Sequence, residues 1–190
     1  NHLTPPESPA DRENGVAGEL WAVHGGGFYQ AQKYAGAPPE MPATLHWFKW
    51  EAYSTWLSGM FLLILIYWLG AEVYLIDSSV LALSHGAAVG IGAAYLLGGW
   101  IVYDQLCKSP LGRNDRVLSA VLFGFLVLIA WSLCQVFGGR GAFIHYGALI
   151  GTIMVANVAH IIIPGQRRMV RALETGEPIN PADGARGKQR

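Results

Sequence analysis

Four long runs of apolar residues dominate the pattern of this sequence. They cover residues 53–76, 80–103, 117–137 and 142–163, and Glu72 is the one Asp, Glu, Lys or Arg residue inside them. Each run reaches the length of about 20 residues that an α-helix needs to cross the hydrocarbon core of a bilayer. The pattern therefore predicts an all-α integral membrane fold with four transmembrane helices.

The composition agrees with a membrane protein. The chain has 190 residues, of which 52% are hydrophobic and 14% are charged. Soluble domains carry about 25% charged residues, so the alternative of a soluble protein with buried core helices is disfavoured. The net charge is zero and gives no indication of a nucleic-acid partner. Cys107 and Cys134 form no CxxC pair, and a disulfide framework is not expected.

The loop charges predict how the helices are oriented. Lys and Arg concentrate after the second and fourth runs, whereas the opposite side carries only Asp77 and Arg140. Because positively charged loops stay in the cytoplasm, we expect these loops and the N-terminal segment to be cytoplasmic. The predicted organisation is a cytoplasmic polar segment 1–51, a transmembrane domain 52–164 with its cytoplasmic loop 104–116, and a basic cytoplasmic tail 165–190.

The polar segments have patterns of their own. Strand-like stretches at 20–24 and 28–34 flank the triple glycine 25–27, which predicts a β-hairpin. A triple glycine also lets backbone N–H groups approach an anionic ligand, so both interpretations stay open. In the tail, residues 166–175 predict a short basic amphipathic helix at the membrane surface.

Small residues recur every fourth position in the second run. The series consists of Gly86, Gly90, Ala94 and Gly98, and Gly147 and Gly151 repeat the spacing in the fourth run. Such a stripe lets the backbone of another helix approach closely. We therefore expect helix–helix contacts there, with a cofactor slot as the alternative.

Four polar residues are predicted to share one layer near the outer face of the membrane. They are Glu72, His85, Gln135 and His145, one on each predicted helix. Two imidazoles at one depth suit the axial ligation of a b-type haem, and Glu72 would orient one of them through its second N–H group. The alternative is that the histidines only form hydrogen bonds between helices.

His160 lies in the fourth run, 15 residues after His145. That separation is about 22 Å along a helix axis, so the two histidines cannot bind one metal. His160 is therefore a candidate ligand for a second metal site, on the cytoplasmic side.

Three stretches carry a family resemblance. They read ELWAVHGGGFYQAQKY (19–34), LHWFKWEAYSTWLSGM (45–60) and YWLGAEVYLID (67–77). Over nearly its whole length the chain resembles the membrane domain of bacterial membrane-bound urate oxidases, the urate hydroxylase PuuD family. The resemblance implies oxidation of urate in the bacterial inner membrane, with electrons passed through haem to a respiratory acceptor such as cytochrome c.

The resemblance also implies that segments lie outside this chain. In the family one helix precedes this region, further helices follow it, and a cytochrome c domain closes the protein. This chain begins at Asn1 and contains no CxxCH motif. We therefore expect a piece of a longer enzyme, with any c-type haem on the missing C-terminal domain, and such a piece need not be active alone.

Residues 24–33 are the predicted site for urate. Urate is a planar anion, and its site needs donors and acceptors along the ring edge, a cationic group and an aromatic face. The candidate substrate residues are His24, Gly25, Gly26, Phe28, Tyr29, Gln30 and Lys33. This prediction comes from residue chemistry and not from the family.

Two other functional classes remain open. A haem-b electron carrier or an oxidoreductase with another substrate would keep the histidines but would not need residues 24–33. A transporter or structural membrane subunit would use the glycine stripes, and its histidines would be incidental.

Overall fold

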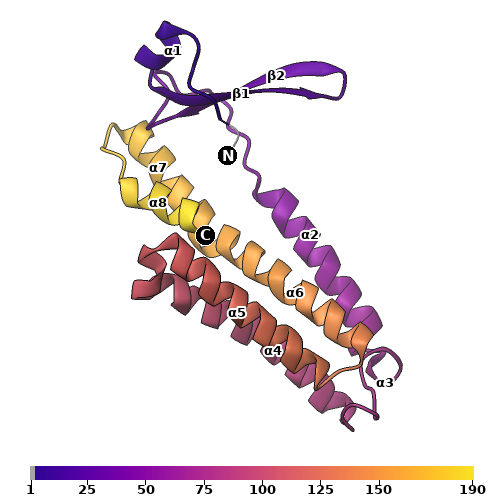
Figure 1. The fold of residues 1–190 in the computed structure, drawn as a ribbon. Coiled ribbons are helices and arrows are strands. Elements are labelled where there is room, and N and C mark those ends of the chain that lie inside the picture. The colour runs from indigo at the N-terminus through magenta and orange to yellow at the C-terminus, as the bar shows by residue number, and fades with distance from the viewer. Residues whose placement is uncertain (1–2) are drawn as a thin grey trace. The chain divides into compact units, whose positions relative to one another are not determined.

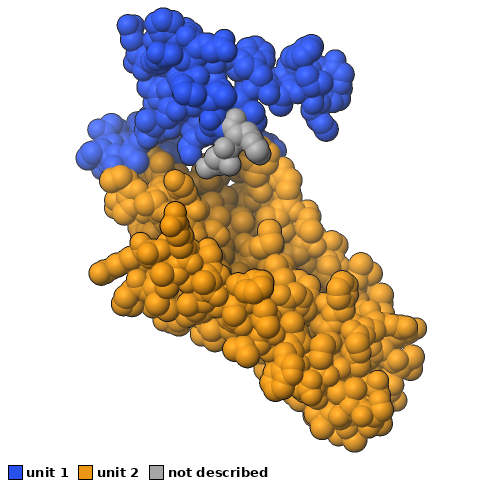
Figure 2. Space-filling view, viewed as in Figure 1, with its two compact units in different colours: residues 1–46, 170–179 blue, residues 47–169, 180–190 orange. Residues whose placement is uncertain are grey.

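The computed structural model describes residues 3–190 and divides into two compact units, which Figure 2 draws in separate colours. The N-terminal unit contains the residues up to His46 together with residues 170–179. The helical unit contains residues 47–169 and 180–190. The residues predicted as one basic tail are thus divided between the two units.

A β-hairpin dominates the N-terminal unit (Figure 1). Strand β1 (Val16–His24) pairs antiparallel with strand β2 (Gly27–Tyr34). Gly25 and Gly26 form the turn with φ angles of 58° and 80°. Positive φ at both central residues is the requirement of a type I′ hairpin turn, which glycine meets without strain. The predicted hairpin is confirmed, and its glycines have a structural role in the turn.

Glu19 connects the hairpin to the residues that precede it. Its side chain is buried, and its Oε1 accepts a hydrogen bond from the backbone N–H of Glu7 (3.1 Å) while Oε2 accepts one from Gln30 Nε2 (3.0 Å). Thr4 pairs with the backbone of Glu19 in an isolated bridge, and helix α1 (Pro9–Glu13) lies between Thr4 and β1 along the chain. Both carboxylate oxygens have protein partners, so Glu19 stabilises this unit.

The rest of the chain is helical (Figure 1). The helices are α2 (Lys49–Leu62), α3 (Ala71–Tyr74), α4 (His85–Lys108), α5 (Asp115–Cys134), α6 (Gly139–Asn157), α7 (Ile163–Thr175) and α8 (Pro181–Gln189). A π-helical stretch, Leu63–Trp68, continues α2, and a second one, Val158–Ile162, joins α6 to α7. A 3-10 turn, Pro110–Arg113, lies between α4 and α5.

Three helices of the described chain are long and apolar enough to cross a membrane. They are His85–Lys108, Asp115–Cys134 and the continuous helix Gly139–Thr175. The predicted first span, 53–76, is not among them, because its α-helix ends at Leu62 and passes into the π-helical stretch. The prediction of a helical membrane protein is supported, whereas the count of four spans is not confirmed.

Polar caps explain why the helices begin where they do. Helix α4 begins directly after Ser84, whose Oγ accepts a hydrogen bond from the backbone N–H of Ala87 (3.3 Å), and not at residue 80 as predicted. Helix α5 begins directly after Asn114, whose Oδ1 accepts bonds from the backbone two and three residues later. Such caps satisfy the free N–H groups of the first turn. At the other end, the helix that includes α6 continues past the predicted end at residue 163.

The core of the helical unit lies where α3, α4, α5 and α6 meet. Its buried residues are Ala71, Leu75, Ala88, Leu133, Phe137 and Ala142. The three alanines let the helix backbones approach closely, which is how helices associate where lipid removes the hydrophobic driving force. Figure 1 shows α4 and α5 running alongside α6.

No other element of the described chain packs closely against the glycines of the predicted stripe in α4. A Cβ added at Gly86, Gly90 or Gly98 would meet nothing within 4 Å. Instead, Gly92 and Gly99 receive side chains from α6. These two glycines are seven residues apart, which is about two helical turns, so they share a face of α4.

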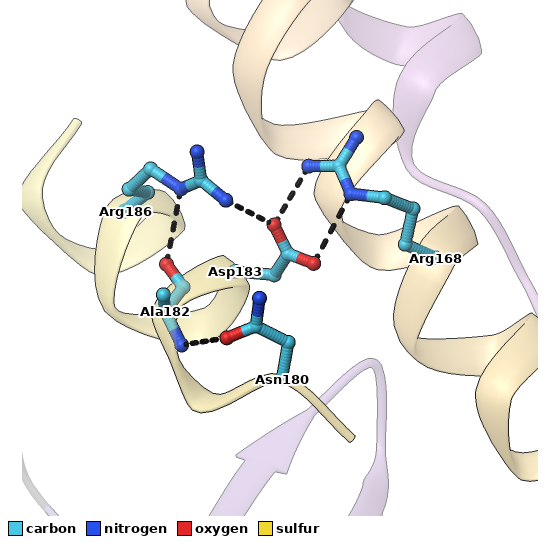
Figure 3. Close-up of polar contacts among 5 residues, drawn as sticks. All are labelled: Arg168, Asn180, Ala182, Asp183 and Arg186. Carbon is cyan, nitrogen blue, oxygen red and sulfur yellow. Dashed lines mark hydrogen bonds and ion pairs between the residues drawn. The ribbon is translucent and has the colours of Figure 1, made fainter. Parts of the chain in front are cut away.

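One buried carboxylate holds α8 against α7 (Figure 3). Asp183 is 6% exposed and accepts hydrogen bonds from Arg168 Nε (3.1 Å) and Arg168 Nη2 (2.7 Å). Arg186 Nη2 also donates to it (2.7 Å), and Asn180 Oδ1 caps the start of α8. A guanidinium that donates twice to a carboxylate fixes geometry as well as charge, so the beginning of α8 is firmly held.

This carboxylate makes the attachment of α8 sensitive to pH. The hydrogen bonds from Arg168, together with the charges of Arg168 and Arg186, hold the pKa of Asp183 below its ordinary value of 3.8. A pKa that is lowered by folding gives stability that is complete above about pH 4 and is lost as the pH falls through the lower folded value. We expect α8 amides, corrected for intrinsic exchange, to be equally protected at neutral pH and at about pH 5, and less protected below about pH 4.

The variant Asp183→Asn tests the origin of this pH dependence. It should lower the protection of α8 at neutral pH and weaken the acid dependence, because the carboxylate that Arg168 and Arg186 bind can no longer be protonated. Protection in the variant that equals the wild type would contradict the assignment.

Candidate functional site

His145 is the buried histidine of the helical unit. It has no exposed surface, and its Nδ1 lies 2.9 Å from the carbonyl oxygen of Gly141. A carbonyl only accepts, so Nδ1 carries the proton and Nε2 accepts the hydrogen bond from Trp68 Nε1 at 3.1 Å. The ring of Phe137 lies 5.0 Å away between centroids, and a Cβ added at Gly92 would lie 2.6 Å from Nε2. His145 thus joins the π-helical stretch after α2 to α4 and α6.

The structure does not bring His85 and His145 together as a pair of axial ligands. His145 packs against Gly92, whereas His85 is exposed at the start of α4, seven residues earlier and about 10 Å away along the helix axis. An iron atom would need to stand about 2 Å from Nε2, where Trp68 and Gly92 already contact it. The arrangement does not fit a haem held by this pair, and Glu72 is exposed on α3. Haem binding itself stays a prediction.

His160 lies in the second π-helical stretch and is exposed. Its Nδ1 lies 3.0 Å from the carbonyl oxygen of Ala156, and its ring centroid lies 6.0 Å from that of Trp100. Within the described part of the chain, no group of three or more His, Cys, Asp or Glu side chains is arranged to hold a metal ion. The structure thus places His160 beside the ring of Trp100 and does not place it in a cluster of metal-binding side chains from the described residues.

The predicted substrate residues are divided between the two faces of the hairpin. Because side chains alternate along a strand, Phe28 and Gln30 project to one face of β2, and Tyr29 and Lys33 project to the other. The strand register places His24 on the same face as Tyr29. Phe28 and Tyr29 are 81% and 56% exposed. Within the N-terminal unit these residues do not converge on one pocket.

A polar cluster at the C-terminal end of α4 was not among the predicted sites. Asp104 and Asn157 are buried at 9% and 3% exposure, and the side chain of Arg190 is 5% exposed. Asp104 pairs with Arg190 Nη1 (2.9 Å) and with Lys108 Nζ (2.5 Å). The Tyr103 hydroxyl donates to the Arg190 carbonyl (3.4 Å), and the guanidinium lies 5.7 Å from the Tyr103 ring centroid. These five residues are called the polar cluster from here on.

Comparison with known proteins identifies the family of the chain. The model of the urate oxidase N-terminal family matches residues 1–190. The chain belongs to this family. Neither the curated proteins nor the solved structures contain a significant match to the chain. Membership indicates a urate-related function and an enzyme of the oxidoreductase type.

The helical unit also has an apolar cavity, which is lined by residues of α2, of the π-helical stretch that follows it and of α6. Its volume is about 700 Å³, and Gly59, Met60, Gly147 and Gly151 are among the residues that line it. None of the described residues that line it carries a charge. A site for an anion needs placed polar groups and a cation, so this cavity does not fit urate.

Proposed function

We propose that the chain is the membrane portion of a urate-oxidising enzyme that passes electrons through haem to a respiratory acceptor, cytochrome c. The observation that carries the proposal is the match of the urate oxidase N-terminal family to residues 1–190. The three apolar helices support a location in a membrane, which we take to be the bacterial inner membrane. Three alternatives are disfavoured: a haem-b carrier with another substrate, a transporter and a structural subunit. None of them explains why the chain matches a urate oxidase family.

Urate consumption by the membrane-bound enzyme tests this function. Membranes that contain the full-length protein should consume urate and reduce cytochrome c in proportion, because both follow from the same electron transfer. Membranes from the same cells without the protein are the control. Membranes with correctly inserted protein that consume no urate, even with an artificial electron acceptor, would overturn the proposal.

In this proposal residues 49–68 form a membrane span in addition to the three apolar helices, and it is the first span along the chain. Helix α2 contributes 14 residues and the π-helical stretch adds 6, which together measure about 30 Å, the thickness of the hydrocarbon core. The charged residues of this segment, Lys49 and Glu51, lie at its start. With four spans, residues 1–48 lie on the cytoplasmic side, together with the segments 104–116 and 165–190.

Topology reporters distinguish four spans from three. A reporter inserted in the linker 37–42 should read cytoplasmic, like reporters after Lys108 and Arg171, because an even number of spans separates these positions. A reporter near Arg140 should read periplasmic. A periplasmic signal from the linker, with the other signals as expected, would leave three spans.

Haem in the intact enzyme stays part of the proposal, with a b-type haem in the membrane domain and a c-type haem on a segment outside this chain. Because His145 is fully bonded to protein, ligation by His85 or His160 would require a second ligand from elsewhere in the longer protein. We expect His145→Ala to leave the haem absorption spectrum of the purified full-length enzyme unchanged and to lower its thermal stability. His85→Ala is the comparison variant. If His145→Ala lost a haem absorption band, His145 would be a haem ligand after all.

A further inference from the structure

We propose that the outer part of the β-hairpin is a membrane-interface anchor, which inserts turn-first among the lipid headgroups of the bilayer. This outer part, residues 20–31, is called the hairpin tip from here on, and it runs from the pair of Leu20 and Ala31 to the glycine turn. The proposal goes beyond urate oxidation and rests only on the location of the chain in a membrane, which the three apolar helices support.

Large apolar side chains are exposed on both faces of the hairpin tip. Val23 and Phe28 are paired across the strands and are 70% and 81% exposed. Trp21 lies on the same face, because side chains alternate along a strand, and is 59% exposed. Leu20 and Tyr29 are exposed on the opposite face. Such a concentration of exposed apolar side chains marks a contact with a membrane or a protein.

The hairpin tip contains no Asp, Glu, Lys or Arg residue, although charged residues stand at both of its ends. The uncharged stretch comprises residues 20–32, and Glu19 precedes it while Lys33 follows it. Glu19 is buried and accepts a hydrogen bond from Gln30, so it belongs to the base of the hairpin. Charged side chains are costly to move into a membrane. The tip has none to move, so its sequence favours contact with lipid.

Within the described N-terminal unit, the buried residues of the hairpin lie at its base. They are Val16, Gly18 and Glu19 of β1, whereas no residue of β2 is buried. Figure 1 shows the two strands extending away from α1 as an arm. An isolated two-stranded hairpin is marginally stable at best in water. The tip therefore gains stability if its surroundings cover the exposed apolar side chains.

Insertion into the membrane interface explains why both faces of the tip are apolar. A protein that lies against a two-stranded ribbon covers one face, whereas turn-first insertion surrounds both faces with lipid. Trp and Tyr, which are both present in the tip, are enriched at membrane–water interfaces. The backbone of Gly25 and Gly26 lies outside the paired strands, and unpaired backbone groups are costly in hydrocarbon. The turn therefore stays among the hydrated headgroups and does not enter the hydrocarbon core.

The covalent linker is long enough to bring the tip to the bilayer. Residues 35–48 separate β2 from α2, and a chain of that length reaches up to about 46–50 Å when extended, at about 3.3–3.6 Å per residue. Helix α2 begins the first span in the proposed topology, so the hairpin is tethered to the segment that enters the membrane. Because the tip is uncharged, its insertion depends on apolar contact and should not require anionic lipids.

Photo-crosslinking of the full-length enzyme, reconstituted in phosphatidylcholine vesicles, tests the anchor. Phe28 is replaced by p-benzoylphenylalanine, which reacts with nearby C–H bonds, and the products are identified by mass spectrometry. We expect phospholipid adducts, as for the same replacement at Phe123, which is 70% exposed on the apolar helix α5. The replacement at Glu13, exposed on α1, should give no lipid adduct. Adding phosphatidylglycerol, or about 1 M salt to screen charges beyond about 3 Å, should not change the yield at Phe28.

The double variant Trp21→Ser and Val23→Ser measures the apolar contribution. Each change removes an apolar contact that contributes about a factor of ten to the ratio of inserted to free tips. The lipid-adduct yield at Phe28 should therefore fall at least about tenfold. Both side chains are exposed, so their loss breaks little packing within the N-terminal unit. Trp50→Ser is the control, because Trp50 is 67% exposed on α2, outside the hairpin, and its loss should leave the yield unchanged.

The outcomes separate the anchor from its alternatives. Adducts of position 28 with protein show that the tip docks on a protein, and the lack of any adduct shows that it lies in water; either result overturns the anchor. A lipid adduct that requires phosphatidylglycerol and disappears in salt overturns the apolar mechanism. These three results leave urate oxidation standing. If position 123 also gives no lipid adduct, the membrane location and the anchor are overturned together.

Discussion

Gly92→Ala is expected to destabilise the helical unit by about 1–3 kcal/mol, the usual cost of forcing one methyl group into a packed core. The added Cβ would lie 2.6 Å from His145 Nε2 and 3.0 Å from Cδ2. The imidazole cannot simply turn away, because Gly141 and Trp68 bond its two nitrogens and Phe137 packs against the ring. Either the α4 backbone must move or both hydrogen bonds must break.

Thermal unfolding of the detergent-solubilised protein measures this effect. For a chain of this size each kcal/mol corresponds to about 2–4 °C in the midpoint. Gly90→Ala is the matched control on the same helix, because its Cβ would meet nothing within 4 Å. That substitution should be neutral or stabilising, since alanine has the higher helix propensity.

A double-mutant cycle assigns the cost to His145. With the imidazole already removed in His145→Ala, the additional change Gly92→Ala should cost far less than it does alone, because the clash no longer exists. Residues in direct contact show coupling of about 0.5–3 kcal/mol in such cycles. Strictly additive effects of Gly92→Ala and His145→Ala would show that the two residues do not share this contact.

Three of the four apolar runs correctly predicted helices that are long and apolar enough to cross a membrane, because length and hydropathy depend on local sequence alone. Their ends were less predictable. Ser84 and Asn114 start α4 and α5 by capping them, and a single polar residue near a long apolar run gives only a weak signal of this. The break between residue 68 and α3 lies at Gly70, inside a run whose one charged residue is Glu72.

The face of α4 that contacts α6 could not be read from spacing. The four-residue stripe that includes Gly86, Gly90 and Gly98 is the standard signature of close packing, yet the contacts are at Gly92 and Gly99. The sequence of α4 supplies small residues on both faces. Which face is used depends on the bulky side chains that α6 presents, and a single helix sequence does not contain that information.

The polar cluster could not be predicted from the sequence, for a different reason. Asp104 and Asn157 occur in different helices, and Arg190 occurs in a tail that had no predicted structure beyond its first helix. A sequence signal did exist, because Asn157 interrupts an apolar run at the membrane side where Asp104 ends another. The sequence analysis gave weight to the histidines instead, because imidazole is the commonest metal ligand among side chains. In the structure, His145 bonds to Gly141 and Trp68 and so joins helices.

Gly112→Ala is expected to have a larger effect than Gly92→Ala, about 3 kcal/mol or more, because its conflict is with the backbone of the turn between α4 and α5. The added Cβ would collide with the carbonyl of Cys107, and it would lie 2.8 Å from Gln189 Nε2. Gln189 donates to the Gly112 carbonyl at 2.6 Å, so the change also removes the contact that holds the end of α8. Arg190 follows Gln189 directly, and its pairing with Asp104 should loosen as well.

Two measurements distinguish this effect from general damage. Gly112→Ala should lower the midpoint of thermal unfolding and raise the hydrogen exchange of α8, while Gly124→Ala, whose Cβ would meet nothing within 4 Å, should change neither. Full stability in Gly112→Ala would mean that the 3-10 turn after α4 is looser than its contacts with Cys107 and Gln189 indicate.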